Sequence, residues 1–425
     1  MTDASTTYDL AILGCGLMGS AAARHASKTG ARVALIGPPE QPKTAWATRE
    51  AFGAHYDEGR ITRMTDPDAT WAALAARSIE RYAEIAEEGG IDFFSEVGHL
   101  AVGPAGVANL VKRASNARAQ GVPCEELDED ALVSRFPYTR FPAGSAAVWE
   151  PRRSGYISAR RLVAAQVAAA ERLGCQVLPH EALAVSGDAD TGFSITLGDG
   201  ATTRALARRV LVATGAFCNA RPLLPQRGGE AHHKLDVAVR TTQTCHFVLS
   251  DADAARLAGM PSIIYKGETF WCYVLPPIAY PDGTTRLKLG GARQPAAGSG
   301  QPTPGTRELH DAAEMSAWYR SGGDTVAAAE MEAMLHELVP GLAPLRVIND
   351  ACANCTTPTG QAYIGQVEAR LAVAVGGNGL AAKSSDEIGR LAAGAALSDE
   401  AGGCWDASQS TLPADVFAPR VRSAP

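Results

Sequence analysis

The sequence predicts an α/β protein in which a domain with a parallel sheet carries an inserted α+β domain with an antiparallel sheet. Two observations support this fold class. A strand–helix–strand unit occupies residues 8–36, and further buried strands at 208–213 and 371–375 return in the middle and near the end of the chain. Between these strands, residues 238–291 contain short strands separated by turns, a pattern typical of an antiparallel sheet.

The expected helices combine an apolar face at helical spacing with good helix formers. They span residues 16–30, 71–88, 158–173 and 384–397. The expected strands are short apolar and β-branched runs bounded by turn residues. They span residues 8–13, 32–36, 175–178, 193–197, 208–213, 239–250, 268–275, 286–290 and 371–375. A Pro/Gly linker is expected at residues 300–305.

The strands of the parallel sheet come from three separate parts of the chain, so we expect this domain to be discontinuous. Residues 1–90, 150–225 and 345–425 would form the parallel-sheet domain. Residues 91–149 and 226–344 would form the inserted, substrate-binding domain. A chain of 425 residues is long enough to bury a core in each.

The composition is that of a soluble globular protein, with 46% hydrophobic and 20% charged residues and a mean hydropathy of −0.06. The 39 Lys and Arg residues against 46 Asp and Glu give a net charge of −7, which leaves no overall positive field for nucleic acid or an acidic membrane. The first residues do not resemble a signal peptide, and the apolar runs fall short of the ~20 residues of a membrane span. We therefore expect a cytoplasmic protein without nucleic-acid or membrane partners. We also expect a monomer or homodimer.

Nine cysteines are scattered along the chain, and this odd number does not resemble a disulfide framework. Cys352 and Cys355 form a CxxC pair, but no second pair follows at the spacing of a zinc site. We expect reduced thiols and no bound metal.

A glycine fingerprint follows the first strand and opens the first helix. The segment GCGLMG at 14–19 has the pattern G-x-G-x-x-G, in which successive glycines permit a tight turn, a close approach of pyrophosphate and close helix–strand packing. The N–H groups and dipole at the helix start favour the phosphate charge. We therefore predict a bound dinucleotide. Its expected contacts are Gly14, Gly16, Leu17, Met18, Gly19 and Ser20.

One part of the dinucleotide pattern is missing. An acidic residue about 20 positions after the first glycine normally binds a ribose hydroxyl, but the second strand here ends at Gly37. Either Glu40 reaches back to the ribose or other groups bind it.

Four later segments carry a family resemblance: DEGRITR at 57–63, RLKLG at 286–290, CANCTTP at 352–358, and GGNG at 376–379 with a lysine at 383. With them the chain resembles, over nearly its full length, the D-amino-acid-oxidase superfamily of flavoproteins. Within it the chain is similar to the branch of monomeric sarcosine oxidase and N-methyl amino acid oxidases. The resemblance implies an FAD-binding, Rossmann-like (GR2-type) parallel-sheet domain and a catalytic antiparallel-sheet domain.

In the first segment the resemblance implies that Arg60 lies beside the flavin and that Arg63 binds the substrate carboxylate. A guanidinium suits this second role, because its donors form a bidentate fork. Without the other segments, two solvated arginines pairing with Asp57 or Asp66 would be the preferred interpretation.

In the second segment the resemblance implies that Lys288 lies over the flavin and activates oxygen, since an ammonium group there would stabilise negative charge that develops during the reaction. Strand alternation alone would instead predict that Lys288 faces solvent. Tyr273 matches an aromatic residue at the substrate face of the family, although a core tyrosine would give the same pattern. Arg60, Tyr273 and Lys288 are thus the catalytic candidates.

The last segments would hold the cofactor. The resemblance implies a thioether between Cys352 and FAD, while Cys355 or an ordinary buried thiol remain alternatives. Lys383 takes the place of the second carboxylate ligand, close to the cofactor. The remaining cofactor contacts implied by the family are Thr214, Gly215, Gly377, Asn378 and Gly379.

The resemblance implies an FAD-dependent oxidase that converts a secondary or N-methylated amino acid to an imine and passes electrons to O₂, yielding H₂O₂. Three alternatives are open within flavoproteins: a dehydrogenase with another acceptor, an oxidase of a cyclic imino acid or opine-type amine, and a non-catalytic flavin-binding subunit. An NAD dehydrogenase would explain the fingerprint but not the later segments.

Overall fold

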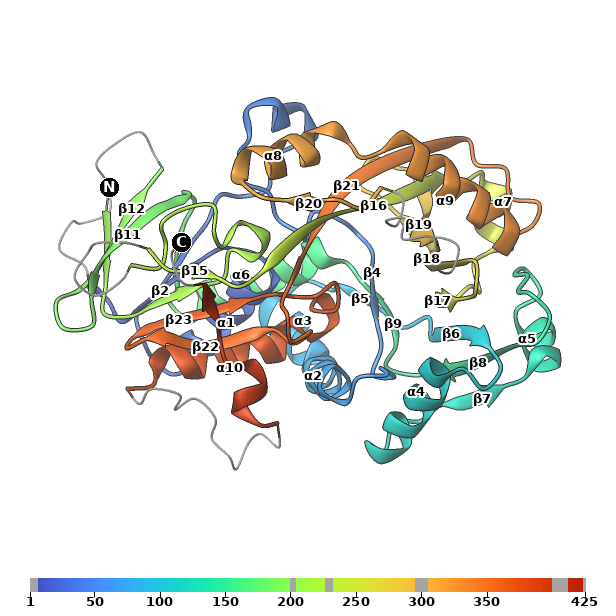
Figure 1. Ribbon diagram of the computed structural model, residues 1–425, viewed down its shortest axis with the longest axis horizontal. Helices are drawn as coiled ribbons and strands as arrows, with labels where there is room; N and C mark the ends of the chain where they lie inside the picture. Colours follow the sequence, from blue (N-terminus) through green and yellow to red (C-terminus); the bar gives the residue numbers. More distant parts are fainter. Residues whose placement is uncertain (1–6, 199–203, 226–231, 295–304, 400–411, 423–425) are drawn as a thin grey trace.

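The computed structural model describes residues 7–198, 204–225, 232–294, 305–399 and 412–422. Figure 1 shows two lobes, one around the strands β2, β22 and β23 and the other around the strands β16 to β19. The Pro/Gly linker expected at 300–305 lies outside the described residues except for its last glycine.

The first lobe is built on a six-stranded sheet with the order β10-β3-β2-β14-β23-β22. All neighbours are parallel except β22, which is antiparallel to β23. Its strands are β2 (Leu10–Leu13), β3 (Val33–Ile36), β10 (Gln176–Leu178), β14 (Val210–Val212), β22 (Tyr363–Glu368) and β23 (Leu371–Val375). The prediction that three distant parts of the chain join one parallel sheet is confirmed.

Three helices pack around this sheet: α1 (Leu17–Ser27), α6 (Ala159–Arg172) and α10 (Ser385–Leu397). Helices α1 and α10 approach closely at Gly389, where a Cβ atom would lie 2.5 Å from the Cβ of Ala21. The small residues of both helices permit this contact, because a larger side chain would have to displace a packed neighbour.

The second lobe is built on a nine-stranded, mostly antiparallel sheet with the order β20-β16-β19-β18-β17-β6-β8-β7, and β21 pairs with β16. Only β6 and β17 run parallel to each other. The strands are β6 (His99–Pro104), β7 (Glu125–Leu127), β8 (Ser145–Glu150), β16 (Ala238–Val248), β17 (Ser262–Lys266), β18 (Phe270–Ala279), β19 (Thr285–Arg293), β20 (Glu308–Leu309) and β21 (Arg346–Thr356). Strand β21 pairs with β16 along its whole length, while the domain boundary at residue 345 stays a prediction.

The helix expected at 71–88 is wrong as a single element. It is two helices, α2 (Ala69–Glu80) and α3 (Tyr82–Gly89), with Arg81 between them at φ −95° and ψ 2°. The Arg81 guanidinium donates to Asp386 and Glu387 of α10 at 2.6 Å each. Apolar periodicity continues across the break, so the sequence pattern contains no sign of this tertiary contact.

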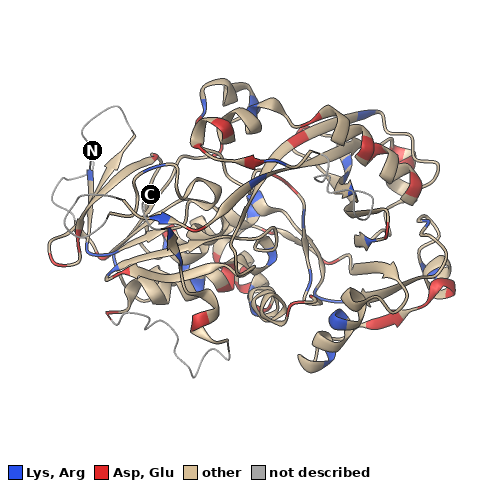
Figure 2. Ribbon diagram, in the orientation of Figure 1, with Lys and Arg blue, Asp and Glu red and all other residues tan. Residues whose placement is uncertain are grey.

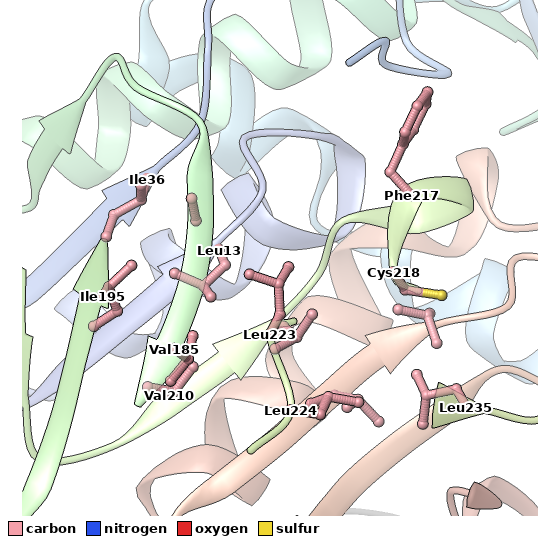
Figure 3. Packing of buried hydrophobic residues seen from close by; sticks show 14 of the residues in the cluster. Leu13, Ile36, Val185, Ile195, Val210, Phe217, Cys218, Leu223, Leu224 and Leu235 are labelled. Carbon is pink, nitrogen blue, oxygen red and sulfur yellow. The ribbon is translucent and has the colours of Figure 1, made fainter. Parts of the chain in front are cut away.

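The strand expected at 8–13 is also divided. Strand β1 (Thr7–Tyr8) pairs with β13 (Arg204–Ala207) in a separate four-stranded sheet, whereas β2 pairs with β3. This four-stranded sheet packs on the six-stranded sheet of the first lobe: Figure 3 shows Val185 and Ile195 beside Leu13, Ile36 and Val210. Burying side chains of this size contributes about 1.5–3 kcal/mol each.

Charged side chains are spread over both lobes. Figure 2 shows Lys and Arg interspersed with Asp and Glu along the described chain, in keeping with the small net charge of −7. Among the described residues, no helix is both long and apolar enough to span a membrane, and no group of three or more His, Cys, Asp or Glu side chains is placed to hold a metal ion.

Candidate active site

Two adjoining cavities lie between the lobes. The first has a volume of about 270 Å³ and is lined by the glycine turn after β2, by residues 49–56 and by the turns at 213–217 and 376–379. The second has a volume of about 690 Å³ and extends from there along the antiparallel sheet. The residues that line both cavities include Tyr56, Arg60, Tyr319, Cys352, Asn354, Asn378 and Gly379. The two cavities therefore form one continuous site.

The glycine fingerprint has the geometry that a dinucleotide turn requires. Gly14 has φ +112°, and a Cβ atom there would lie 2.5 Å from the oxygen of Ala213. A Cβ atom at Gly19 would lie 1.8 Å from the oxygen of Gly14, so this glycine permits the helix to pack on the strand. At Gly16, the nearest atom to a Cβ would be 3.9 Å away, which leaves the backbone open to the cavity.

Four of the six contacts predicted for this segment line the first cavity, namely Gly14, Gly16, Leu17 and Met18, and so does Cys15. Gly19 and Ser20 are buried beneath them in α1. Helix α1 has Gly16 as its N-cap and no side chain caps it. Its first N–H groups are therefore available to an anionic ligand, as in other phosphate-binding helix starts.

Gly37 has a steric reason to be glycine. A Cβ atom at this position would lie 2.7 Å from the nitrogen and 2.9 Å from the Sγ of Cys15, so an acidic side chain does not fit there. Glu40 does not reach back either, because Arg160 binds its carboxylate with two hydrogen bonds of 2.6 and 2.7 Å. Of the two alternatives for the ribose, the structure favours binding by other groups.

Five other predicted cofactor contacts also belong to the first cavity. Thr214, Gly215, Gly377, Asn378 and Gly379 all line it. Asn378 has φ +50°, and its side chain accepts from the nitrogen of Thr357 at 3.0 Å and donates to the oxygen of Gly376 at 2.6 Å. These bonds fix the turn around the cavity.

Two buried polar atoms facing the first cavity have no partner among the described residues: Oγ1 of Thr214 and Nδ1 of His55. Burial and the nearby Arg160 lower the pKa of His55 to about 3, so its imidazole is neutral. Buried polar atoms are normally hydrogen-bonded. Together with the open helix start, they fit a large polar ligand such as a dinucleotide.

Cys352 lies where the two cavities meet. It is partly exposed on β21, and its backbone oxygen accepts from Nε1 of Trp318 at 2.6 Å. Cys355 also touches the first cavity but is 7% exposed and belongs to the hydrophobic core. The position of Cys352 is therefore the more open of the two, and the thioether itself stays a prediction.

Lys288 is fully buried and lines neither cavity. The expectation from strand alternation that it faces solvent is wrong. Its ammonium group donates to the Asp57 carboxylate and, at 2.8 Å, to the oxygen of Gly59. Burial and the charge of Arg60 lower the pKa of Lys288 to about 8.

Asp57 connects two of the catalytic candidates. Its carboxylate pairs with Lys288 and with Arg60 and accepts from the Tyr280 hydroxyl at 2.9 Å. Burial alone would raise the pKa of Asp57, but Lys288 and Arg60 hold it well below the usual range. The Tyr280 hydroxyl also contacts Nδ1 of His246 at 3.0 Å, so this network extends into β16.

The predicted substrate residues Arg63, Tyr273 and Lys383 all line the second cavity. Arg63 is 4% exposed, and its Nη1 lies 2.5 Å from Oδ2 of Asp66. The Nζ of Lys383, which is 3% exposed, lies 3.4 Å from the same oxygen. The two residues expected to bind the substrate carboxylate thus both contact Asp66. Lys383 is also expected to contact the cofactor, but it does not line the first cavity.

The pairings of Arg60 with Asp57 and of Arg63 with Asp66 were the alternative interpretation of this segment. Both pairs are present, but the Arg63 pair is buried rather than solvated, with side-chain exposures of 5% and 2%. Arg60 and Arg63 therefore form these ion pairs and also line the second cavity.

Sequence reasoning missed Arg113, Lys266, His246 and Tyr280. The signal for Arg113 was available, because it stands on the apolar face of α4 (Ala108–Ala119), whose other buried residues are Leu110, Ala114 and Ala117. An arginine at such a position is buried and requires polar partners.

The chain belongs to the DAO family of FAD dependent oxidoreductases, whose family model matches residues 9–395. The chain is therefore an FAD-dependent oxidoreductase, and both the fold class and the family resemblance are confirmed.

Individual relatives are more distant. N-methyl-L-tryptophan oxidase of Yersinia pestis (strain Pestoides F) is 24% identical over 394 residues, which cover 91% of this chain and 94% of that protein. The structure of NikD, described as an unusual amino acid oxidase essential for nikkomycin biosynthesis, matches with a TM-score of 0.72 at 17% identity over 99% of both chains. Glycine oxidase from Geobacillus kaustophilus matches with a TM-score of 0.68 at 19% identity over 97% of this chain and 98% of that one.

The substitution Asp57→Asn should destabilise the protein, because it leaves Lys288 and Arg60 without their carboxylate. Breaking a buried ion pair from one side costs about 3–5 kcal/mol, so the thermal midpoint of the flavin-loaded protein should fall clearly. Adding Lys288→Met should restore part of the loss, since it removes one unpaired charge. Glu171→Gln, an exposed carboxylate on α6, is the control and should change little. Equal midpoints for Asp57→Asn and the control would contradict the role of Asp57.

Proposed function

We propose that the protein is an amine oxidase that uses FAD to oxidise the C–N bond of a secondary or N-methylated amino acid to an imine, with O₂ as the electron acceptor and H₂O₂ as the product. The observation that carries the proposal is the convergence of buried Arg63 and Lys383 in a cavity that adjoins the glycine-lined cavity. The relationship to N-methyl-L-tryptophan oxidase supports the same substrate class.

In this proposal the substrate carboxylate binds to Arg63 and Lys383, which orients the rest of the amino acid toward the junction of the cavities. FAD bound in the first cavity supplies the hydride acceptor. Tyr273 and Arg60 also line the second cavity, Arg60 lines the first cavity as well, and the two side chains would fix the position of the reacting carbon. The cations of the cavity favour the neutral form of the amine, which is the form that can lose hydride.

Lys288 acts on oxygen through its charge. The group formed by Lys288, Arg60 and Asp57 carries one net positive charge, which stabilises negative charge that develops during oxygen reduction. The proposal includes a cytoplasmic location and a monomeric or homodimeric state.

A second candidate is a dehydrogenase of the same substrate class. One observation favours it: Lys288 is fully buried, pairs with Asp57 and lines neither cavity, so its charge is partly neutralised. A weaker electrostatic stabilisation of reduced oxygen would leave the electrons to another acceptor.

Anaerobic mixing of the purified protein with N-methyl amino acids should bleach the flavin, and air should restore the colour with release of H₂O₂. Bleaching followed by slow reoxidation in air, but fast reoxidation by an artificial acceptor, would instead support the dehydrogenase. Arg63→Ala should retain FAD but raise the concentration of amine needed for bleaching by at least about 100-fold, since a buried charge-assisted pair is lost. A flavin that no secondary amine, cyclic imino acid or opine reduces would contradict the proposal and favour a flavin-binding subunit.

The flavin should be attached through Cys352. Acid precipitation of the wild-type protein should carry the yellow colour into the pellet, whereas the Cys352→Ala variant should release it into the supernatant. Cys355→Ala is the matched control and should keep the flavin attached. Release from the wild-type protein, or retention in Cys352→Ala, would contradict the assignment.

Carboxylate binding should weaken above pH 8. Burial lowers the pKa of Lys383 to about 8, and the lysine binds an anion only while it is protonated. The dissociation constant of butyrate, a carboxylate without an amine, should therefore rise toward about tenfold per pH unit above pH 8. In Lys383→Arg this rise should disappear, since a guanidinium stays charged. The same pH dependence in both proteins, measured by perturbation of the flavin spectrum, would contradict the role of Lys383.

A further inference from the structure

The second cavity contains two cations besides the two residues expected to bind the substrate carboxylate. Arg63, Arg113, Lys266 and Lys383 all line it. One of them is exceptional, because Arg113 is 1% exposed and its guanidinium has no carboxylate within ion-pair distance among the described residues. Its partners are neutral oxygens: Nε donates to Oδ1 of Asn109 at 2.9 Å and Nη1 donates to the oxygen of Thr65 at 2.7 Å.

Arg113 and Arg63 share an acceptor. Nη1 of Arg63 also donates to the oxygen of Thr65, at 3.1 Å. Two buried guanidinium groups are thus held on one carbonyl oxygen, an arrangement of like charges that is unfavourable without a nearby anion. In addition, the Nε of Arg63 is buried and has no partner among the described residues.

Three carboxylates of the chain, Asp66, Asp68 and Glu150, lie near this cluster, and each has partners other than Arg113 and Lys266. Asp66 pairs with Arg63 and Lys383. Glu150 is fully buried, and its two oxygens accept from the backbone nitrogens of Met64 and Thr65 at 2.9 and 2.8 Å. Asp68 also lines the cavity, and its carboxylate accepts from the nitrogen of Trp71 at 3.0 Å and from Nε2 of Gln361 at 2.9 Å. None of the described carboxylates lies within ion-pair distance of Arg113 or Lys266, so these two cations remain available to a ligand.

The electrostatic environment of the cluster agrees with these contacts. Burial and the charge of Arg63 lower the pKa of Arg113 to about 9. Burial, Arg113 and Arg63 also lower the pKa of Lys266, which lies at the exposed end of β17. Each of these cations therefore lies within electrostatic reach of the others, and a bound anion would stabilise all of them.

We propose that the substrate is an amino acid with two carboxylates, whose second carboxylate binds to Arg113 and Lys266 while the first binds to Arg63 and Lys383. This inference rests on the proposed function and narrows its substrate class to dicarboxylic secondary amines. The cavity volume of about 690 Å³ is in the usual range for a site that encloses a small ligand.

The first test uses ligands that cannot react. Succinate and butyrate have the same chain length but two carboxylates and one, and their binding to the flavin-loaded protein is measured at equal ionic strength by thermal shift and by perturbation of the flavin spectrum. Succinate should bind at least about tenfold more tightly, which corresponds to about 1.4 kcal/mol. Equal binding would overturn the inference.

Variants test whether the preference for succinate depends on Arg113 and Lys266. Arg113→Gln should reduce the preference for succinate to less than about threefold, because one cation of the second subsite is lost. Lys266→Gln should also reduce the preference for succinate. Because Lys266 is exposed, this variant provides the test if Arg113→Gln does not fold. Lys112→Gln removes a neighbouring exposed charge from the same helix and is the matched control, which should keep the preference. An unchanged preference in Lys266→Gln and in a folded Arg113→Gln would overturn the inference.

The second test separates this inference from the proposed function. Anaerobic bleaching is compared for N-methyl-L-aspartate against N-methyl-L-asparagine and for N-methyl-L-glutamate against N-methyl-L-glutamine. Faster bleaching by the acids than by their amides supports the inference. Bleaching by the amides alone, or equally by both, would overturn it and leave the proposed function in place. If no amine bleaches the flavin but the Arg113-dependent preference for succinate persists, the proposed reaction fails while the second anion subsite is supported.

Discussion

The site depends on buried cations that are stabilised by carboxylates from one short segment of the chain. Asp57 pairs with Arg60 and Lys288, and Asp66 pairs with Arg63 and Lys383. Strand β4 (Arg60–Thr62) lies between these two acids and pairs with β9 (Gly155–Ile157). A buried charge without a partner costs several kcal/mol. The segment from 57 to 66 therefore stabilises Lys383 of the short 3-10 helix Ala382–Ser384 at the second cavity, and Lys288 of β19 next to Asp57, which itself lines that cavity.

The two acids leave the two ends of the site with different properties. At the Asp57 end, the Lys288 ammonium group is bound by the carboxylate and the Gly59 oxygen and lines neither cavity, so its charge reaches a ligand only over a distance. At the Asp66 end, Arg63 and Lys383 reach the cavity themselves. The first arrangement suits a field that acts at a distance, and the second suits direct binding of an anion.

The sequence predicted the features that arise from local rules. Strand β23 (Leu371–Val375) has the predicted bounds, since a charge-free apolar run that ends in a glycine turn determines both its type and its end. The fingerprint at 14–19 is a local backbone geometry and was likewise predictable. The ion pair of Lys288 with Asp57 joins residues 231 positions apart, and no local periodicity contains that information. The same limit applies to the break at Arg81, whose guanidinium contacts α10.

The position of Cys352 at the cavity depends both on the local alternation of side chains along β21 and on the long-range pairing of β21 with β16. Its register pairs Cys352 with Thr242 and Asp350 with Thr244, and all four residues line the second cavity. Because side chains alternate along a strand, a slip by one residue would turn Cys352 away from the junction and bring a core residue to it. The eleven paired positions between β16 and β21 make such a slip costly. The placement of the thiol is therefore a property of the antiparallel sheet, even though the cofactor fingerprint belongs to the parallel one.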